Sequence, residues 1–285
     1  MIRHGLLACT CFLTLLIPLP CWAIPAEGEP PPPDLRLNDP KPTKILVRVV
    51  AHGAMVLGRE VGGARVTITD VETKQVLATG VQQGEAGDQN QIMKTPHLME
   101  EPVYSARPAA AFAATVELRR PTLVEVAAEG PLGYPASMRR TAKTILLIPG
   151  QDITDDGIVL HLNGYIVEIE DPKAGEPLIS KDDVRLKASV RTLSGTFVRP
   201  HGDWDSRKIR IYGELLIGDR IVERLQMFYS NDTRTFDTPF FVPVDKEAPE
   251  GITLRVVAAD TATGNFSVGE AHYPVVSERL HPARR

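Results

Sequence analysis

The sequence predicts an all-β protein that contains two antiparallel β-sandwich domains in tandem, preceded by a signal peptide and a proline-rich linker. Three observations support this fold class. Many short stretches alternate apolar and polar residues, and turn residues separate these stretches. In addition, no long segment shows a helical period of 3.6 residues with caps at its ends. Short strands that are separated by turns are typical of sandwiches.

Residues 1–23 have the parts of a secretory signal peptide in order. Arg3 supplies positive charge, residues 6–17 form an apolar run, and Pro18 ends that run. Small residues stand at positions −3 and −1 of a cut before Ile24. The run is shorter than the roughly 20 apolar residues that a spanning helix needs. The sequence therefore predicts a periplasmic or secreted protein, without a transmembrane segment in the mature chain.

All three cysteines, Cys9, Cys11 and Cys21, lie in this segment, so cleavage would leave a chain without thiols or disulfides. Lipidation at Cys9 or Cys21 is the alternative to simple cleavage. Neither cysteine has a good lipobox, because the apolar run before Cys9 is too short and Leu19-Pro20 precedes Cys21. The stability of an exported chain without disulfides must come from its apolar cores.

The charge balance argues against nucleic acid as a partner. The chain has 32 Lys and Arg residues against 36 Asp and Glu residues. Loss of Arg3 with the signal peptide leaves 31 against 36, a net charge of −5. Nucleic-acid binding depends on a basic surface, and this composition does not provide one. No basic amphipathic helix indicates a membrane-surface role either.

The proline content and the turn residues divide the chain into five parts. Residues 24–43 are rich in proline and predict an extended linker. We expect a first β-sandwich over 44–150, a second over 157–277 and a tail over 278–285. The boundary between the two sandwiches is placed at 149–157, where Pro, Gly and Asp residues cluster.

Alternation places the individual strands. In the first domain we expect strands at 45–50, 64–70, 75–79, 112–118, 123–127 and 144–148. In the second domain we expect them at 158–162, 165–169, 184–190, 209–217, 221–229, 240–242, 252–259 and 273–276. Asn163-Gly164 and Gly218-Asp219 are two-residue turn signals, and each predicts a β-hairpin between the strands that flank it.

Part of the first domain resembles a known family. The residues are Gly62-Gly63-Ala64-Arg65-Val66-Thr67-Ile68-Thr69-Asp70, then Thr73, then Val76-Leu77-Ala78-Thr79-Gly80. This pattern resembles the carboxypeptidase regulatory-like group of transthyretin-like β-sandwiches. Ala64, Val66 and Ile68 would fill a core, while Asp70 and Thr73 would bond the backbone of a turn. The aromatic strand residue that the group shows directly after a glycine is absent at 84–89.

The end of the second domain resembles another group. Leu254-Arg255-Val256-Val257-Ala258-Ala259-Asp260, followed by Gly264-Asn265, is similar to the ending of bacterial immunoglobulin-like and fibronectin-like repeats. One extra residue separates Asp260 from Gly264 here. The resemblance implies that Asp260 and Asn265 hold a turn near the last strand. Neither resemblance brings a catalytic residue, so a non-enzymatic protein without a cofactor is expected.

Two groups of residues are candidates for a functional site. Met93, His97 and Met99 lie in an irregular segment, roughly 81–111, and thioether and imidazole groups are ligands that suit copper. The alternative is that the methionines only pack the segment onto the sandwich.

The second group is Trp204 with its neighbours His201, Asp203 and Asp205. A partly exposed Trp beside polar groups can stack on a sugar or anchor a protein partner. The alternative is a core Trp that is held by an Asp-rich turn.

Three classes of function remain. The first is a non-catalytic binding or scaffolding module of the cell envelope, whose partner is an envelope protein or a glycan. The second is an exported copper-binding protein that uses Met93, His97 and Met99. The third is a carbohydrate-active enzyme with paired acids. No Gly-x-Ser-x-Gly elbow and no His-Glu-x-x-His motif is present, so common hydrolase sites are excluded.

Overall fold

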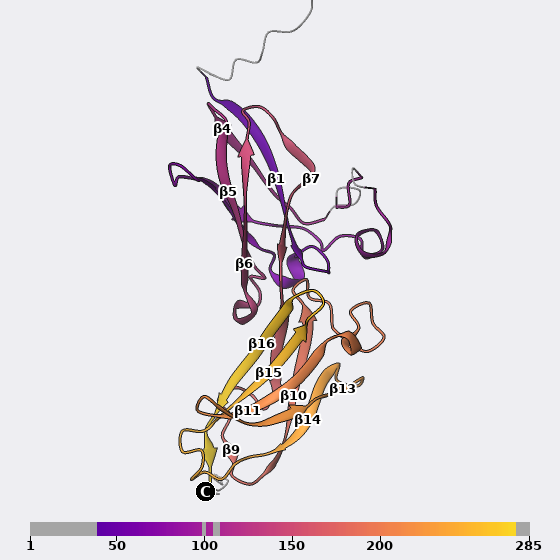
Figure 1. Ribbon diagram of the computed structural model, residues 1–285, viewed down its shortest axis with the longest axis vertical. Helices are drawn as coiled ribbons and strands as arrows, with labels where there is room; N and C mark the ends of the chain where they lie inside the picture. The colour runs from indigo at the N-terminus through magenta and orange to yellow at the C-terminus, as the bar shows by residue number, and fades with distance from the viewer. Residues whose placement is uncertain (1–38, 99–100, 105–108, 278–285) are drawn as a thin grey trace, which may run out of the picture. The chain divides into compact units, whose positions relative to one another are not determined.

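The computed structural model describes residues 39–98, 101–104 and 109–277. Within these ranges, all but two of the strand pairs are antiparallel, and the chain forms two β-sandwiches (Figure 1). The predicted all-β fold class is confirmed. The signal peptide, residues 24–38 of the linker, Met99 and the tail lie outside the described residues. In the described part of the chain, no helix has the length and apolar content that crossing a membrane requires.

The first sandwich consists of a three-stranded and a four-stranded sheet. The three-stranded sheet has the order β4-β1-β7, with β4 at Phe112–Leu118, β1 at Lys41–Ala51 and β7 at Ile153–Leu162. The four-stranded sheet has the order β3-β2-β5-β6, with β3 at Val76–Val81, β2 at Arg65–Asp70, β5 at Thr122–Gly130 and β6 at Arg139–Leu147. β1 pairs with β4 in antiparallel and with β7 in parallel orientation.

The alternating residues just before and along β2 meet in the core, as the sequence predicts. Ala64, Val66 and Ile68 are completely buried. The turn after β2 also has the expected chemistry, because the carboxylate of Asp70 accepts bonds from the Glu72 and Thr73 amides at 2.7 and 3.0 Å. These bonds, that from Thr73 foremost, hold the pKa of Asp70 below its usual range.

The second sandwich consists of two four-stranded sheets and a short strand pair. One sheet has the order β13-β14-β10-β8, with β13 at Phe228–Ser230, β14 at Thr235–Phe241, β10 at Asp183–Thr192 and β8 at Tyr165–Asp171. The other has the order β12-β11-β15-β16, with β12 at Arg220–Gln226, β11 at Arg210–Ile217, β15 at Ile252–Asp260 and β16 at Asn265–Tyr273. The short pair is β17 at Val275–Val276 and β9 at Leu178–Ile179.

One of the two predicted hairpins is confirmed and the other is wrong. β11 and β12 pair across Gly218-Asp219, and Gly218 adopts the positive φ of 57° that such a turn favours. β7 and β8 do not pair across Asn163-Gly164. β7 pairs with β1 of the first sandwich, and β8 pairs with β10 of the second. Asn163-Gly164 is therefore the connection between the two sandwiches, not a hairpin turn.

The cluster of Pro, Gly and Asp residues at 149–157 contains an irregularity within β7. The register of β7 against β1 shifts between Ile153, which is opposite Ile45, and Ile158, which is opposite Val47. Residues 154–157 form the extra length, so they bulge out of the sheet. The strand pairing places the joint between the sandwiches at 163–164, and the domain division stays a proposal.

Within the described ranges, four short helices complete the fold. They are η1 at Arg59–Val61, η2 at Asn90–Lys94, η3 at Pro135–Ser137 and η4 at Ser206–Lys208. The helix η2 has the wider π-type turn, and the other three are 3₁₀ turns. Of these, η2 and η4 carry residues of the candidate sites.

Candidate functional site in the loop between β3 and β4

The long connection between β3 and β4 packs on the outer face of the sheet β4-β1-β7. Along β1, Val49 points into the main core, so its neighbour Val50 points to the other face. Val50 contacts a separate apolar cluster to which the connection contributes Ile92, Tyr104 and Ala110. This packing gives the connection a fixed base on the sandwich.

A carboxylate from the bulge of β7 holds the far end of the connection. The two oxygens of Asp156 accept bonds from the backbone amides of Val103 and Tyr104 at 2.6 and 2.7 Å. Beneath them, the buried guanidinium of Arg48 donates to the carbonyl of Asp155 at 2.5 Å. Burial lowers the pKa of Arg48, and the charge of Asp156 opposes that shift. The bulge therefore places the carboxylate of Asp156 against the backbone of the loop.

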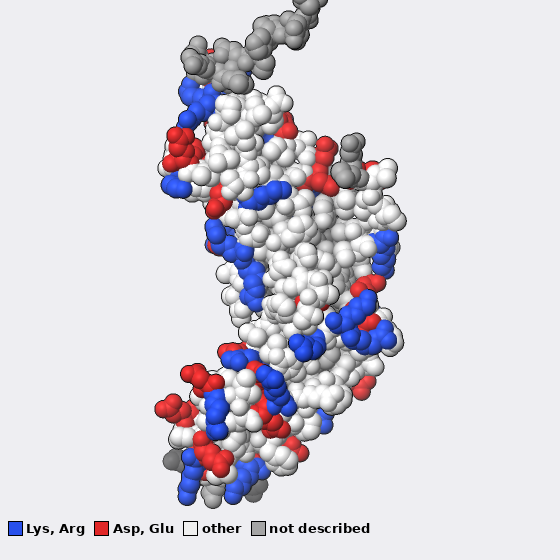
Figure 2. Space-filling model, viewed as in Figure 1, with Lys and Arg blue, Asp and Glu red and all other residues white. Residues whose placement is uncertain are grey.

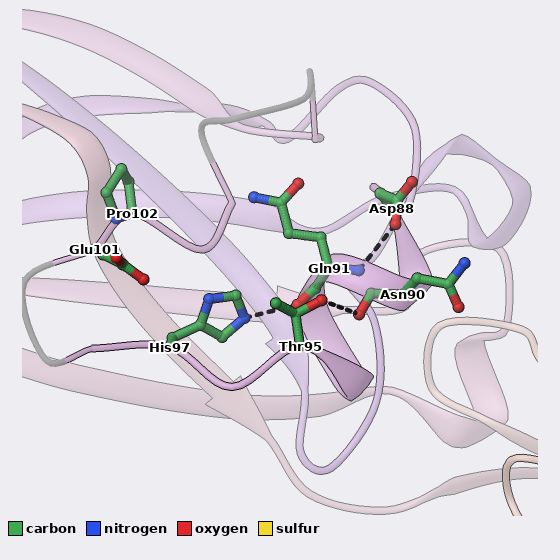
Figure 3. Close-up of a pocket in the computed structure, with 7 residues that line it drawn as sticks. All are labelled: Asp88, Asn90, Gln91, Thr95, His97, Glu101 and Pro102. Carbon is green, nitrogen blue, oxygen red and sulfur yellow. Dashed lines mark hydrogen bonds between the residues drawn. The ribbon is translucent and has the colours of Figure 1, made fainter.

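The described part of this connection borders an open pocket of about 640 Å³ beside η2 (Figure 3). Residues before and within the helix lie on one side of the hollow, and the segment after the helix lies on the other. The residues that line it are Asp88, Asn90, Gln91, Thr95, His97, Glu101 and Pro102. Amide, hydroxyl, imidazole and carboxylate groups thus converge on one space.

Local hydrogen bonds fix the walls of this pocket. Asp88 accepts a bond from the Gln91 amide at 2.9 Å, and Thr95 donates its hydroxyl proton to the Asn90 carbonyl at 3.1 Å. The His97 Nε2 atom lies 2.6 Å from the Gln91 carbonyl oxygen. Since a carbonyl only accepts, Nε2 carries a proton and donates, and Nδ1 keeps a lone pair when the ring is neutral.

The arrangement suits hydrogen bonding better than catalysis. The Nε2 atom of His97 donates to a backbone carbonyl and is thus not the atom that could accept a proton from a hydroxyl nucleophile. Glu101 accepts a bond from the Leu98 amide at 3.3 Å. Both pocket acids, Asp88 and Glu101, thus serve backbone N–H groups.

Of the proposed copper ligands, two can be placed. Met93 lies on η2 with its side chain exposed, and His97 lines the pocket. Met99 is outside the described residues. Within the described ranges, no group of three or more His, Cys, Asp or Glu side chains is arranged to hold a metal ion. The copper set stays a prediction.

Trp204 lies at the joint between the two sandwiches. Its half-buried ring packs against both large apolar cores, and its Nε1 donates to the Gly53 carbonyl at 2.9 Å. It also lines a small cavity of about 120 Å³ together with Gly53, Gly164 and Asn265. The ring therefore contacts residues of both sandwiches, whereas the sequence suggested either a recognition loop or a single core.

The acids beside Trp204 have separate partners. Asp203 accepts from Gln89 Nε2 at 2.7 Å and pairs with Lys94 Nζ at 3.0 Å. Bonds from Lys94 first, then from Gln89, lower the pKa of Asp203. Asp205 caps η4 by accepting from the backbone amide of Arg207 at 3.0 Å. The Arg207 side chain also binds Asp205, and these bonds hold the pKa of Asp205 far below its usual range.

His201 completes the turn before Trp204. Its backbone amide donates to Asp205 at 3.2 Å, and its φ of 57° is in the left-handed region. The four residues His201, Asp203, Trp204 and Asp205 therefore lie near one another. Asp203 and Trp204 contact the first sandwich, while His201 and Asp205 stabilise the turn. A role for these four residues in binding a ligand stays a prediction.

Asn265 has a different role from the one that its resemblance implies. Asp260 does hold the turn before β16, because it accepts bonds from the amides of Ala262 and Thr263 at 2.9 and 3.4 Å. Asn265 instead accepts from the Gly164 amide at 3.0 Å and donates to the His52 carbonyl at 3.1 Å. Its amide thus connects the joint with a turn of the first sandwich.

Sequence reasoning missed most of the pocket. Only His97 was a candidate, while Asp88, Asn90, Gln91 and Glu101 were not singled out. A usable signal was present in the polar run at 87–91, which interrupts a segment without alternation.

On the face shown in Figure 2, basic and acidic side chains form small groups of both signs. Local hydrogen bonds, more than a long-range electrostatic field, therefore determine what such a surface can bind.

Neither a protein-family model nor a curated protein matches this sequence. Several solved structures share some likeness with it. Fibronectin(III)-like modules of Clostridium thermocellum CbhA are 10% identical, with a TM-score of 0.26, over 78% of this chain and 82% of that one. A chimeric titin Z1Z2 that carries a decorin peptide is 11% identical, with a TM-score of 0.26, over 85% of this chain and 100% of that one.

Three N-terminal domains of the bacteriophage RB49 outer capsid protein Hoc are 10% identical, with a TM-score of 0.27. That match covers 83% of this chain and 59% of the other. All three TM-scores are below 0.5, so these likenesses carry no argument about function. The assignment of two β-sandwiches rests on the strand pairing. The carboxypeptidase regulatory-like family stays a prediction.

Proposed function

We propose that this protein is an exported, non-catalytic binding module of the cell envelope, and that the pocket beside η2 is its ligand site. The observation that carries the proposal is the pocket itself. A rigid sandwich presents a long loop, the apolar cluster and Asp156 fix that loop, and several polar side chains converge on the pocket. Binding residues are commonly found on loops that a rigid scaffold positions.

The polar side chains that line the pocket support a glycan as its ligand. Its lining offers amides from Asn90 and Gln91, a hydroxyl from Thr95 and the imidazole of His97. These groups can both donate to and accept from sugar hydroxyls. A volume of about 640 Å³ is within the usual range for small-ligand sites. The third hypothesis, a carbohydrate-active enzyme, is weaker because Asp88 and Glu101 both bind backbone amides.

A glycan array tests this proposal with defined probes. The wild-type chain should bind a subset of the glycans, and Asn90→Ala and His97→Ala should each weaken that binding about ten-fold. Asn231→Ala is a matched control, because Asn231 is an exposed asparagine in the turn between β13 and β14. Binding that survives both pocket changes would place the ligand elsewhere. Hydrolysis of a bound glycan would favour the enzyme hypothesis.

Export needs a test of its own. We expect cleavage after Ala23, so mass spectrometry of the exported chain should find Ile24 as its first residue. A membrane-retained chain that begins at Met1 would contradict export by cleavage. A lipid-modified cysteine at the new N-terminus would instead show a lipoprotein.

A further inference from the structure

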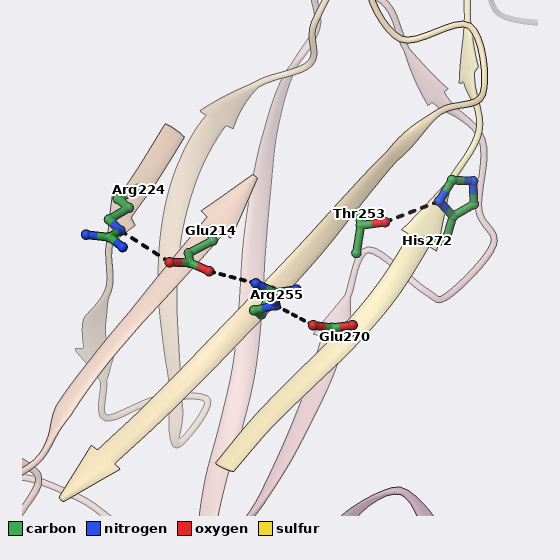
Figure 4. Close-up of polar contacts among 6 residues, drawn as sticks. All are labelled: Glu214, Arg224, Thr253, Arg255, Glu270 and His272. Atoms are coloured by element: carbon green, nitrogen blue, oxygen red, sulfur yellow. Dashed lines mark hydrogen bonds and ion pairs between the residues drawn. The ribbon is translucent and has the colours of Figure 1, made fainter. Parts of the chain in front are cut away.

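The outer face of the sheet β12-β11-β15-β16 carries a row of four alternating charges. Glu214 on β11 is directly opposite Arg255 on β15, and Arg255 is opposite Glu270 on β16. Arg224 on β12 is opposite Glu214 on its other side. Figure 4 shows the four side chains in one line across the strands. We call this row the charge ladder.

Hydrogen bonds connect every neighbouring pair of the ladder. Glu214 accepts from Arg224 Nε at 3.2 Å and from the Arg255 guanidinium at 3.2 Å. Arg255 Nε also donates to Glu270, and the bonds to Glu270 and Glu214 raise the pKa of Arg255. Glu214 is almost completely buried in spite of its charge, while Arg224 and Glu270 at the two ends are exposed. Both end charges are thus bonded within the ladder and also accessible to a partner surface.

Apolar side chains cover the same face on the side of the ladder nearest the joint. Tyr212, Val257 and Val268 form the next row across β11, β15 and β16. Val268 is 48% exposed, and Phe266, one row further on, is 53% exposed. Exposed apolar side chains that are bordered by polar groups mark protein-binding surfaces.

We propose that this face binds the same face of a second copy of the chain, around a two-fold axis that runs parallel to the strands. The ladder reads plus, minus, plus, minus from β12 to β16. Rotation about such an axis reverses the order of the strands in the second copy. Arg224 then faces Glu270 of the second copy, and Glu214 faces Arg255. The two exposed end charges, Arg224 and Glu270, each meet their opposite, and a two-fold contact repeats that pair.

The ladder also excludes the other simple packing. An axis perpendicular to the strands would keep the strand order, so Arg224 would face Arg224 and Glu270 would face Glu270. Like charges at close range are unfavourable and reject such a partner. With the axis parallel to the strands, the apolar rows face each other as well, and Val257 lies over Tyr212 of the second copy. The charges therefore favour packing around an axis parallel to the strands over packing around an axis perpendicular to them.

The size of the face sets the expected strength of the contact. Four strands span about 19 Å and seven residues span about 24 Å, from the usual strand spacing and rise. That is on the order of 500 Å² for each copy, or about 1,000 Å² in total, which is at the low end for specific interfaces. The pair should therefore be a weak dimer that is observed at high protein concentration.

Sedimentation equilibrium with the full chain tests the proposal through a charge swap. The wild type should dimerise as its concentration rises, and high salt should weaken the dimer because it screens the exposed end charges. Glu270→Arg alone places two positive groups against each other across the contact, and Arg224→Glu alone places two negative ones. Each variant should dimerise about ten-fold more weakly than the wild type. A mixture of the two variants restores opposite charges at both positions, so it should associate as the wild type does.

One further variant serves as a control, and another tests the apolar row. Glu250→Arg makes the same charge change at an exposed residue in the loop before β15, away from the ladder, and should leave the dimer unchanged. Val268→Glu alters an exposed apolar side chain, so we expect it to fold and to weaken association. Circular dichroism confirms that each variant is folded. A wild type that stays monomeric at millimolar concentration overturns the proposal. So does an association that Glu270→Arg leaves intact, or a mixture that fails to recover.

Discussion

The indole Nε1 of Trp204 donates a hydrogen bond of 2.9 Å to the carbonyl oxygen of Gly53. Gly53 belongs to a turn of the first sandwich, and Trp204 belongs to the loop between β10 and η4 of the second. Asn265 donates to the carbonyl of His52, the neighbouring residue in that turn. Two side chains from the second sandwich therefore bind adjacent carbonyls of the first. Residues of the joint are thus expected to contribute to the stability of the folded chain.

Trp204→Ala should lower the free energy of unfolding by about 3 kcal/mol, because the ring packs against both cores. Trp204→Phe keeps much of the packing but loses the bond to Gly53, so about 1 kcal/mol is expected. Urea denaturation of the three proteins measures both effects. An unchanged stability in Trp204→Ala, together with a loss of ligand binding, would instead favour the recognition role of this loop.

A second prediction concerns Gln82, a buried amide in the first sandwich. Its Oε1 accepts from the Val49 amide at 2.6 Å, and its Nε2 donates to the carbonyls of Val49 and Leu57 at 3.0 and 2.9 Å. Gln82→Ala leaves the Val49 amide and the Leu57 carbonyl without these partners, and each buried unpaired group costs about 1–3 kcal/mol. We expect a loss of about 3 kcal/mol in chemical denaturation.

The neighbouring residue Gln83 provides the matched control for that experiment. Its side chain is exposed, so Gln83→Ala should change stability by less than about 0.5 kcal/mol. Equal effects of the two substitutions would show that the buried amide of Gln82 contributes nothing beyond its neighbour.

A third prediction concerns alkaline pH. Tyr273 is completely buried and donates its hydroxyl proton to the Pro172 carbonyl at 2.9 Å. Burial, with help from the nearby acids Glu176 and Asp171, raises the pKa of Tyr273 to about 12. Because an unfolded tyrosine ionises near pH 10, stability should be lost as pH rises from about 10 toward 12.

Tyr273→Phe isolates this contribution. It removes one hydrogen bond, so a loss of about 1 kcal/mol at pH 7 is expected. Above pH 10 the variant should lose stability less steeply than the wild type, because it has one fewer tyrosine to ionise on unfolding. Thermal melts across pH 7 to 11 measure both slopes. Parallel curves would mean that Tyr273 ionises as readily in the folded chain as in the unfolded one.

A fourth prediction tests the copper hypothesis. His97 Nε2 binds the Gln91 carbonyl, and the Met93 side chain is exposed on η2. We therefore expect that Cu(I) leaves the melting temperature unchanged, because an ion that binds the folded state would raise it. If Cu(I) raises the melting temperature, and this rise disappears in both His97→Ala and Met93→Ala, the result would instead support Met93, His97 and Met99 as a metal site.

Alternation alone predicted most strands of both sandwiches, because a half-buried strand must place its apolar residues on one face. β16 was missed for a physical reason. Asn265 and Ser267 point inward to bind the joint, while Phe266 and Val268 point outward. This reverses the usual pattern of apolar residues inside and polar residues outside, and the next inward residues, Gly269 and Ala271, are small, so the apolar signal of a core strand is weak there.

The Asn163-Gly164 error shows how a distant contact can override local turn chemistry. The dipeptide has the composition of a tight hairpin, and Gly164 does have a positive φ of 135°. The Gly164 amide, however, binds the side chain of Asn265, 101 positions further along the chain. The placement of the loop that carries the pocket escaped prediction for a similar reason, since the backbone amides of Val103 and Tyr104 donate to Asp156 in β7. No local pattern in the sequence encodes such a contact.

The parallel pairing of β1 with β7 also has a consequence for synthesis. Arg48 and its acceptor Asp155 are separated by 107 positions, so the ribosome completes nearly the whole first sandwich before they can meet. Until then β1 has one open edge, and an open edge is a site where strands of other chains can pair. Contacts between such distant positions are slow to form. A nascent chain that stops near residue 150 should therefore be prone to aggregation. Extension to residue 162, the end of β7, should reduce that aggregation.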